Sequence, residues 1–455
     1  MNPLHDCCVN ETQTAIGMEG KIMAKRIVAI IFIYVMCSMA WLVLGQVMSS
    51  RSNNSNSNLR SQVAGLWGSQ QVQKAPNITF EWYNYETETE TVTDPKTNKV
   101  NVVKKQVKRW HFEPMLLAST DINVDFDLDY RQKGLLWYST YLVEFQGEYS
   151  YTHTDDKSGN VVITYIFPSS LATYENFNLI INGQNTNNLS PVNENGMKVI
   201  KKRLAIHPGQ TVQFSVSYVS RGLDLWTYAF GTDVNRINDF RLAMNTNFDG
   251  IDFPEGTISP SSKTQTDDGW QLEWDFDTLI SGFNIGMDMP KKLNPGPLAA
   301  QISRFAPISL LFFFVWMFVI TLLKKIDLHP INYLFLGASF FAFHLLFSYT
   351  VDRVPLIPAF IISSVVSVFL VISYLRLAVG IRFAALEAGI SQIIYLVLFS
   401  YAHFYEGWTG LIVTIGSIIT LFTIMQLTGR INWSEKFSAT SQRPPVASPV
   451  TPSHP

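Results

Sequence analysis

Residues 305–323 read FAPISLLFFFVWMFVITLL, and they open a C-terminal block of apolar runs separated by short polar breaks. The block contains five runs, each close to the length of about 20 residues that an α-helix needs to cross a bilayer. The five runs are residues 305–323, 331–349, 356–374, 381–401 and 408–427. A buried bundle in a soluble protein is the alternative, but five runs joined by loops this short favour a five-helix membrane bundle over residues 305–427.

A further apolar run, residues 27–48, follows a polar N-terminal tail of residues 1–26. A secretory signal peptide has a shorter apolar core and a cleavage site flanked by small residues. This run is too long for such a core and offers no good site, so it is predicted to be an uncleaved signal-anchor helix, with a cleaved signal peptide as the alternative. Together with the C-terminal block, the sequence predicts six membrane spans.

Basic residues close to the ends of the runs predict the orientation, because such residues stay on the cytoplasmic side of a membrane. They lie before the first run, after the second, around the break between the fourth and fifth, and after the sixth: Lys21, Lys25, Arg26, Lys324, Lys325, Arg376, Arg382, Arg430, Lys436 and Arg443. The pattern predicts a multi-pass protein with both termini in the cytoplasm. Residues 49–304 are then expected outside the cytoplasm.

Residues 49–304 read as a β-rich domain. A run of Ser and Asn at residues 50–58 is predicted to be a flexible tether. Residues 121–130 alternate apolar and polar side chains, which is typical of a strand with one buried face. Further strands are predicted at residues 79–92, 100–110, 149–153, 161–167, 199–206, 211–219, 225–230, 240–245 and 270–276. Their spacing favours an antiparallel sandwich or a large antiparallel sheet.

Turn-forming segments between neighbouring strands predict three β-hairpins, at residues 79–110, 149–167 and 199–219. The last segment, residues 428–455, contains many Ser and Pro residues and is predicted to be a disordered cytoplasmic tail. The expected fold class is therefore a multi-domain membrane protein, in which a six-span α-helical transmembrane bundle carries a β-rich antiparallel extracytoplasmic domain.

The charge, the cysteine positions and the missing motifs limit the classes of function that the chain can have. The formal net charge is −2, which gives no electrostatic case for a nucleic acid partner. Cys7, Cys8 and Cys37 all lie outside residues 49–304, so the β domain is expected to fold without disulfides. The sequence contains no metalloprotease motif, nucleophile elbow or phosphate-binding glycine loop. It therefore predicts a non-enzymatic protein without a cofactor or a metal site.

The acidic residues of the 121–130 strand have two interpretations, a metal site and a solvated strand face. Asp125, Asp127 and Asp129 share one face of the strand, at a rise of roughly 3.3 Å per residue. A calcium loop of the EF-hand type needs a glycine and a terminal glutamate, which are absent here. A solvated strand face is the favoured interpretation.

Four ionisable residues of the membrane block are candidate functional residues. Asp327 and His329 precede Pro330 at the expected cytoplasmic start of a span, where proline in a first helical turn is ordinary. Their structural interpretation is a helix cap, in which Asp327 accepts a hydrogen bond from the helix start or from His329. His344 and Glu387 lie within predicted spans, where ionisable groups are candidates for transport or proton transfer.

The expected depths of His344 and Glu387 differ. At 1.5 Å per residue, His344 lies roughly 20 Å deeper than His329, toward the outer side. Glu387 lies toward the inner side, where it is expected to pair with Arg382 or to extend to the interface. The two side chains are not expected to meet if both helices are regular.

The membrane block resembles a known family. Residues 328–337, LHPINYLFLG, resemble the LHPxxYLLVG segment of the CreD family of cell envelope integrity inner membrane proteins. Residues 428–433, TGRINW, look like the TRxIDW close of that family, and residues 130–138 are similar to its RxRGIYxxxVY region. The order of one N-terminal span, a large periplasmic domain and a C-terminal bundle also matches. The resemblance covers most of residues 27–437.

The resemblance implies a bacterial inner membrane protein involved in envelope integrity and the stress response, with no established catalytic residues. We expect a non-enzymatic role in which the periplasmic β domain binds or senses an envelope protein or a cell-wall component. The membrane lipid bilayer is the other expected partner. The alternative is a transporter or lipid-handling protein that uses His344 and Glu387.

Overall fold

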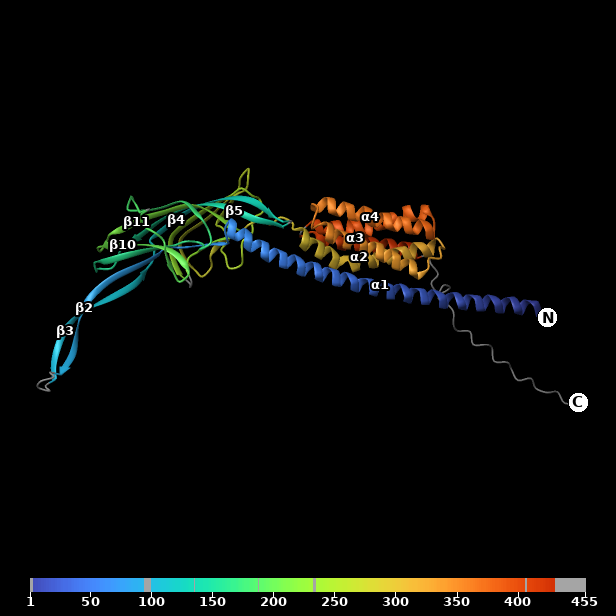
Figure 1. Ribbon diagram of the computed structural model, residues 1–455, viewed down its shortest axis with the longest axis horizontal. Helices are drawn as coiled ribbons and strands as arrows, with labels where there is room; N and C mark the ends of the chain where they lie inside the picture. Colours follow the sequence, from blue (N-terminus) through green and yellow to red (C-terminus); the bar gives the residue numbers. More distant parts are fainter. Residues whose placement is uncertain are drawn as a thin grey trace. The chain divides into compact units, whose positions relative to one another are not determined.

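The computed structural model describes residues 3–93, 100–134, 136–186, 188–231, 235–405 and 407–429. The chain divides into two compact units, one formed by Met1–Ser55 with Leu293–Pro455 and the other by Asn56–Lys292. Figure 1 shows that the first is helical and the second β-rich. The predicted cytoplasmic tail from residue 430 onward lies outside the described residues.

The described residues contain six helices that are long and apolar enough to cross a membrane, which confirms the six predicted spans. They are Met23–Leu66 within α1 (Pro3–Leu66), Pro295–Leu323 (α2), Pro330–Thr350 (α3), Leu356–Ala378 (α4), Phe383–Phe404 and Thr409–Thr428 (α7). Aromatic rings fill the core of this unit, and Phe313, Phe340 and Phe343 are fully buried. Many of the aliphatic side chains on these helices remain exposed, as lipid-facing positions do.

The fifth span departs from a regular α-helix. It contains two π-helical segments, η1 (Phe383–Gly389) and η2 (Ile393–Leu398), which flank the single turn α5 (Ile390–Gln392). The span ends in α6 (Phe399–Tyr401) and a 3₁₀ turn, η3 (Ala402–Phe404). Because π-helical turns are rare and occur frequently at functional sites, this span is a candidate for a functional role.

The predicted tether at residues 50–58 is wrong, because α1 continues through it to Leu66. Ser and Asn lie below Ala in helix propensity by at most about 0.7 kcal/mol per residue, which other contacts easily outweigh. Arg51 pairs with Asp352, and Arg60 lies 2.5 Å from Asp224. Composition alone therefore does not identify a break in this helix.

The β unit contains three sheets. The three-stranded sheet has the order β1 (Gln71–Lys74), β12 (Leu225–Ala229) and β16 (Ile285–Asp288). The five-stranded sheet has the order β3 (Val100–Met115), β2 (Asn77–Thr93), β6 (Gly159–Ile166), β10 (Met197–Ile206) and β9 (Val192–Glu194). The eight-stranded sheet has the order β14 (Ser262–Gln265), β15 (Trp270–Ser281), β13 (Asn235–Thr246), β4 (Ser119–Lys133), β5 (Leu136–Thr152), β11 (Thr211–Leu223), β7 (Tyr174–Ile181) and β8 (Gln184–Asn185).

Neighbouring strands are antiparallel throughout these sheets except for two parallel pairs, β1 with β12 and β4 with β13. The predicted β-rich, mainly antiparallel fold is therefore confirmed. Strand β4 also shows the predicted alternation, with Ile122 and Val124 buried and the aspartates exposed. Asp125 and Asp127 accept hydrogen bonds from asparagine amides at 2.7 and 2.6 Å, so the acidic face is a solvated strand face.

Only the first predicted hairpin forms, by pairing of β2 with β3. The hairpins predicted at residues 149–167 and 199–219 are wrong, because β5 and β11 belong to the eight-stranded sheet and β6 and β10 to the five-stranded sheet. Both connections carry the chain from one sheet to the other. Their turns bind each other: the His153 amide donates to the Gln210 carbonyl at 3.0 Å, and the Gly209 amide donates to the His153 carbonyl at 2.8 Å.

One polar cluster links the three sheets inside the β core. The hydroxyls of Tyr165 on β6 and Tyr218 on β11 both donate to Oε1 of Gln73 on β1, each at 2.9 Å. All three side chains are fully buried. Burial raises the pKa of Tyr165 and Tyr218 well above the ordinary value, so both hydroxyls keep the protons that they donate.

Candidate functional site

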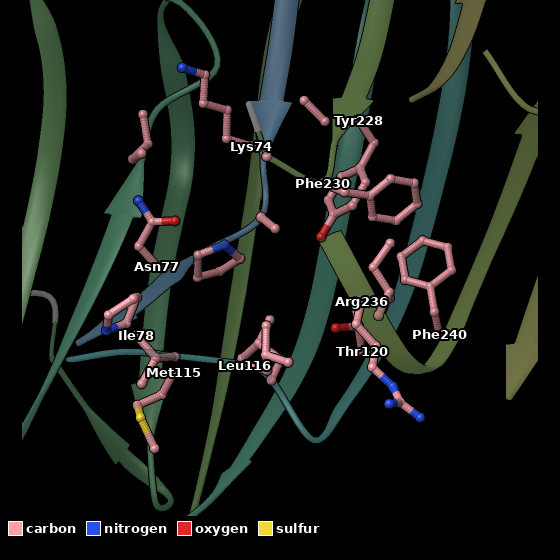
Figure 2. A pocket seen from close by; sticks show the side chains of 18 of the residues that line it. Lys74, Asn77, Ile78, Met115, Leu116, Thr120, Tyr228, Phe230, Arg236 and Phe240 are labelled. Atoms are coloured by element: carbon pink, nitrogen blue, oxygen red, sulfur yellow. The ribbon is translucent and has the colours of Figure 1, made fainter. Parts of the chain in front are cut away.

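A pocket of about 510 Å³ opens in the β unit, where strands from all three sheets end. Its walls come from the end of β1, the start of β2, the end of β3 and the adjoining loop, the end of β12 and the start of β13 (Figure 2). The volume falls within the range of roughly 300–1,000 Å³ that is typical of small-molecule sites. The convergence of three sheets therefore creates space for a ligand.

The pocket is lined mainly by apolar side chains. Ile78, Tyr228 and Phe240 are almost fully buried beneath it, and Leu116 is more than half exposed at its surface. Burial raises the pKa of Tyr228 well above the ordinary value, so this phenol is neutral at physiological pH. Such a surface suits a hydrocarbon chain or another apolar group.

Two basic residues, Lys74 and Arg236, also line the pocket, and no carboxylate does so among its described residues. Figure 2 shows their nitrogen atoms on opposite sides of the apolar surface. Nζ of Lys74 lies 3.6 Å from the sulfur of Met197, a weak acceptor that leaves the charge uncompensated. Within the part of the chain that the structure describes, neither cation forms an ion pair. The pocket therefore presents positive charge beside apolar surface.

The structure places His329 at the start of α3 as a helix cap. Its Nδ1 accepts a hydrogen bond from the Ile331 amide at 3.3 Å, which agrees with the structural interpretation of this residue. Asp327 instead pairs with Arg26 of α1, and its side chain is 79% exposed. The two candidates are thus held by different partners.

His344 lies inside an aromatic shell. Its Nδ1 donates to the Phe340 carbonyl at 3.1 Å, and the rings of Trp41 and Phe343 meet its ring edge-on at 5.7 and 4.9 Å. The imidazole is almost fully buried. No hydrogen bond or ion pair joins His344 to Glu387 in the described part of the chain, so the structure does not bring these two candidates together.

Glu387 pairs with Lys324, which follows α2, and not with Arg382, the first of the two alternatives expected for it. It lies on the π-helical segment η1, and its side chain is only 18% exposed. Its Oε2 atom is buried and has no hydrogen-bond partner among the described residues. Lys324 lies 63 residues before Glu387 in the sequence, so local spacing gives no indication of this partner.

A series of hydrogen bonds made by polar side chains links α5, α4 and α3, and it was not predicted from the sequence. Nε2 of Gln392 donates to Oγ of Ser367 at 2.8 Å, and Ser367 donates to the Ser339 carbonyl at 2.7 Å. Gln392 is fully buried. A glutamine within an apolar run was the available signal, because polar residues in membrane spans usually have a specific partner.

The pocket in the β unit was also missed. Its lining residues come from segments around residues 74–79, 114–120 and 228–240, which are far apart in the sequence. No local motif marks them. In the described residues there is also no group of three or more His, Cys, Asp or Glu side chains that could hold a metal ion.

Comparison with known proteins gives one extensive match. The family model described as inner membrane protein CreD matches residues 22–295 and 298–434. No curated protein matches the chain. Among solved structures, a putative nutrient-binding protein from Legionella pneumophila is 11% identical, with 45% of this chain and 74% of that chain covered and a TM-score of 0.31. An M1 zinc metallopeptidase from Deinococcus radiodurans is 8% identical, with 74% and 98% covered and a TM-score of 0.20. At these TM-scores, neither structure supports an argument about fold or function.

Proposed function

Because this chain belongs to the CreD family of inner membrane proteins, we propose that it holds a periplasmic β unit that binds a negatively charged amphiphile of the cell envelope. This proposal rests on the pocket of about 510 Å³. Apolar side chains and two basic residues line it, and no carboxylate does so among its described residues. Binding of such a ligand would serve envelope integrity and the response to envelope stress. The proposed role is recognition, without a catalytic step.

The chemistry of the pocket supports this class of ligand. Leu116, which is exposed, and Phe230, which is half-buried, offer apolar surface to a hydrocarbon segment, which gains about 25 cal/mol per Å² of area removed from water. Lys74 and Arg236 offer hydrogen bonds to a phosphate or carboxylate, and charge-assisted bonds are roughly twice as strong as neutral ones. A neutral or cationic amphiphile would leave these charges without a partner.

We further propose that both termini are cytoplasmic and that the β unit lies outside. The basic residues near the ends of the spans support this orientation, and two ion pairs fit the alternation of sides that it requires. Arg26, near the start of the first span, pairs with Asp327, which follows the second, so both groups belong to one membrane surface. Arg51 pairs with Asp352 between the third and fourth spans, which fits the opposite surface.

Reporter fusions test the orientation. We place a dual cytoplasmic and periplasmic reporter after Asn58, Lys325, Asp352, Gly380, Glu406 and Phe437. The expected result is an external signal only from the fusions after Asn58, Asp352 and Glu406. A cytoplasmic signal from the Asn58 fusion contradicts a periplasmic β unit and with it the proposed function.

Site-specific photocrosslinking in cells tests the pocket. A benzophenone amino acid replaces Leu116, which lines the pocket and is 54% exposed, in the full-length chain. After irradiation, mass spectrometry of the purified protein is expected to show an adduct with the mass of an anionic lipid. The matched control places the same group at Leu171, which is 68% exposed and outside the pocket, and it is expected to give no such adduct.

Charge variants sharpen this test. Lys74→Ala and Arg236→Ala each remove one charge-assisted contact of about 1.5–3 kcal/mol, so we expect the adduct yield to fall about tenfold or more in at least one of them. Equal yields in both variants and the parent, or equal labelling at Leu171, would mean that the benzophenone reports a nonspecific encounter. That outcome removes the support for an anionic ligand.

A further inference from the structure

The outward face of the β2–β3 hairpin carries an aromatic strip, formed by Tyr83, Tyr85, Trp110 and Phe112. These four side chains are 46%, 61%, 42% and 63% exposed. Figure 1 shows the hairpin reaching beyond the other strands of the β unit. Contiguous exposed apolar surface is uncommon on monomeric proteins and marks interaction sites.

Strand register places these rings on one face. Tyr83 lies opposite Trp110, Tyr85 opposite Lys108, and Phe112 opposite Glu81, and side chains two residues apart share a face. The other face of β2 carries Ile78 and Phe80, which are buried in the core. The aromatic strip therefore lies on the face of the hairpin that points away from the core, and its rings are not part of the main core of the β unit.

Positive charge is fixed within the strip. Nζ of Lys108 lies 3.6 Å from the centre of the Tyr83 ring and 4.4 Å from that of Trp110. Lys104 lies on the same face of β3, four residues nearer the turn. Contact with two rings holds the Lys108 ammonium group at the surface between them.

Most carboxylates of the β2–β3 hairpin lie on the face opposite the aromatic strip. Glu86, Glu88 and Glu90 alternate with the strip residues along β2, and Arg109 lies 3.0 and 3.7 Å from the first two. On the strip face, the described part of the hairpin has only Glu81, which is 2.9 Å from Arg203. Lys104 and Lys108 form no ion pair among the described residues, so the strip offers their charges to a negatively charged partner.

The polar groups beside the strip are hydroxyls and an amide. Thr87 lies opposite Gln106, and Thr89 lies opposite Lys104, all on the strip face and all exposed. Aliphatic side chains that would enter lipid are scarce there, with Val102 as the described example. Flat rings, hydroxyls, an amide and ammonium groups match a chain of sugar rings that carries acidic substituents.

We propose that the aromatic strip binds an anionic polysaccharide. The C–H faces of the sugar rings carry a partial positive charge and pack on the negative faces of Tyr85, Trp110 and Phe112. Carboxylate or phosphate groups of the polysaccharide pair with Lys108 and Lys104. This surface is separate from the pocket of the β unit, since none of the strip residues lines that pocket.

The test measures binding of the full-length chain, in detergent, to immobilised alginate. Dextran supplies sugar rings without charge, and polyglutamate supplies carboxylates without sugar rings. We expect retention on alginate alone at low salt. Tyr85→Ala combined with Trp110→Ala is expected to weaken alginate binding about tenfold or more, and Lys108→Gln to weaken it and reduce its salt dependence.

Matched variants distinguish polysaccharide binding by the strip from ligand binding in the pocket. Phe283→Ala removes an aromatic ring that is 59% exposed elsewhere in the β unit, and it is expected to leave alginate binding unchanged. Lys74→Ala, in the pocket, is expected to leave it unchanged as well, so failure of one proposal is distinguishable from failure of the other. Equal retention on polyglutamate overturns the proposal. So does binding of the chain in nanodiscs to phosphatidylglycerol vesicles through the strip residues, with no binding to alginate.

Discussion

Replacing Gln73 with leucine is expected to lower the free energy of unfolding of the β unit by about 2–5 kcal/mol. The variant removes the shared acceptor of the Tyr165 and Tyr218 hydroxyls, and each buried hydroxyl left without a partner costs about 1–3 kcal/mol. Because Gln73 connects strands of all three sheets, the loss is expected to extend through the whole unit. Hydrogen exchange of the full-length chain, read on peptides of β1, β6 and β11, measures it.

A triple variant supplies the control for this experiment. Gln73→Leu combined with Tyr165→Phe and Tyr218→Phe removes the two hydroxyls together with their acceptor. Replacing both partners of a buried hydrogen bond by apolar groups is nearly neutral, so most of the lost stability is expected to return. A triple variant as unstable as Gln73→Leu would show that packing of the glutamine, and not the two hydrogen bonds, maintains the cluster.

Gly68→Ala is expected to destabilise the β unit by about 3–5 kcal/mol. Gly68 follows the end of α1 at φ +146°, a conformation that is essentially restricted to glycine. An added Cβ would also lie 2.0 Å from the Arg221 carbonyl oxygen on β11, so the backbone would have to move. Strain and overlap each cost of the order of 1–3 kcal/mol. Thermal unfolding of the purified full-length protein is expected to shift downward by about 6–15 °C.

Gly65→Ala is the matched control for Gly68→Ala. Gly65 lies three residues earlier, inside α1, where an added Cβ meets no atom within 4 Å. Alanine is a better helix former than glycine by about 0.5–1 kcal/mol, so the control is expected to be neutral or slightly stabilising. Equal losses in the two variants would contradict the assignment of the effect to the conformation of Gly68.

The membrane spans could be predicted because length and hydropathy are properties of local sequence. Each predicted run falls within or close to a helix of the structure, and the α1 segment from residue 27 to 48 is one example. The continuation of α1 to Leu66 could not be predicted from a Ser/Asn-rich composition. Arg51 and Arg60 find partners in Asp352 and Asp224, which lie far away in the sequence.

The strands could also be predicted, but their pairing could not. Alternation identifies a strand such as β4 with one buried face, yet it carries no information about which neighbour lies beside it. The turns at residues 154–158 and 207–210 look like hairpin turns. Instead, each turn connects two sheets, and the backbone of His153 binds the second turn. Such a contact between two turns is invisible in either segment alone.

The candidate site shows the same limit. His329 could be predicted as a cap because Pro330 follows it directly, and a helix start is a local feature. The partner of Glu387 could not be predicted, because Lys324 is 63 residues away in the sequence. The pocket combines residues from three sheets and has no sequence signature.

The parallel pairing of β1 with β12 has a consequence for the time course of folding. Gln73 and Tyr218 are 145 residues apart, and contacts of such separation form slowly because the intervening chain must first be ordered. During synthesis β1 emerges early and stays unpaired until β12 has been made. Its unpaired backbone groups can meanwhile form non-native contacts that lead to misfolding and aggregation. The first strand to be made is thus among the last to be paired, and the nascent β unit has an extended interval in which it would profit from chaperones.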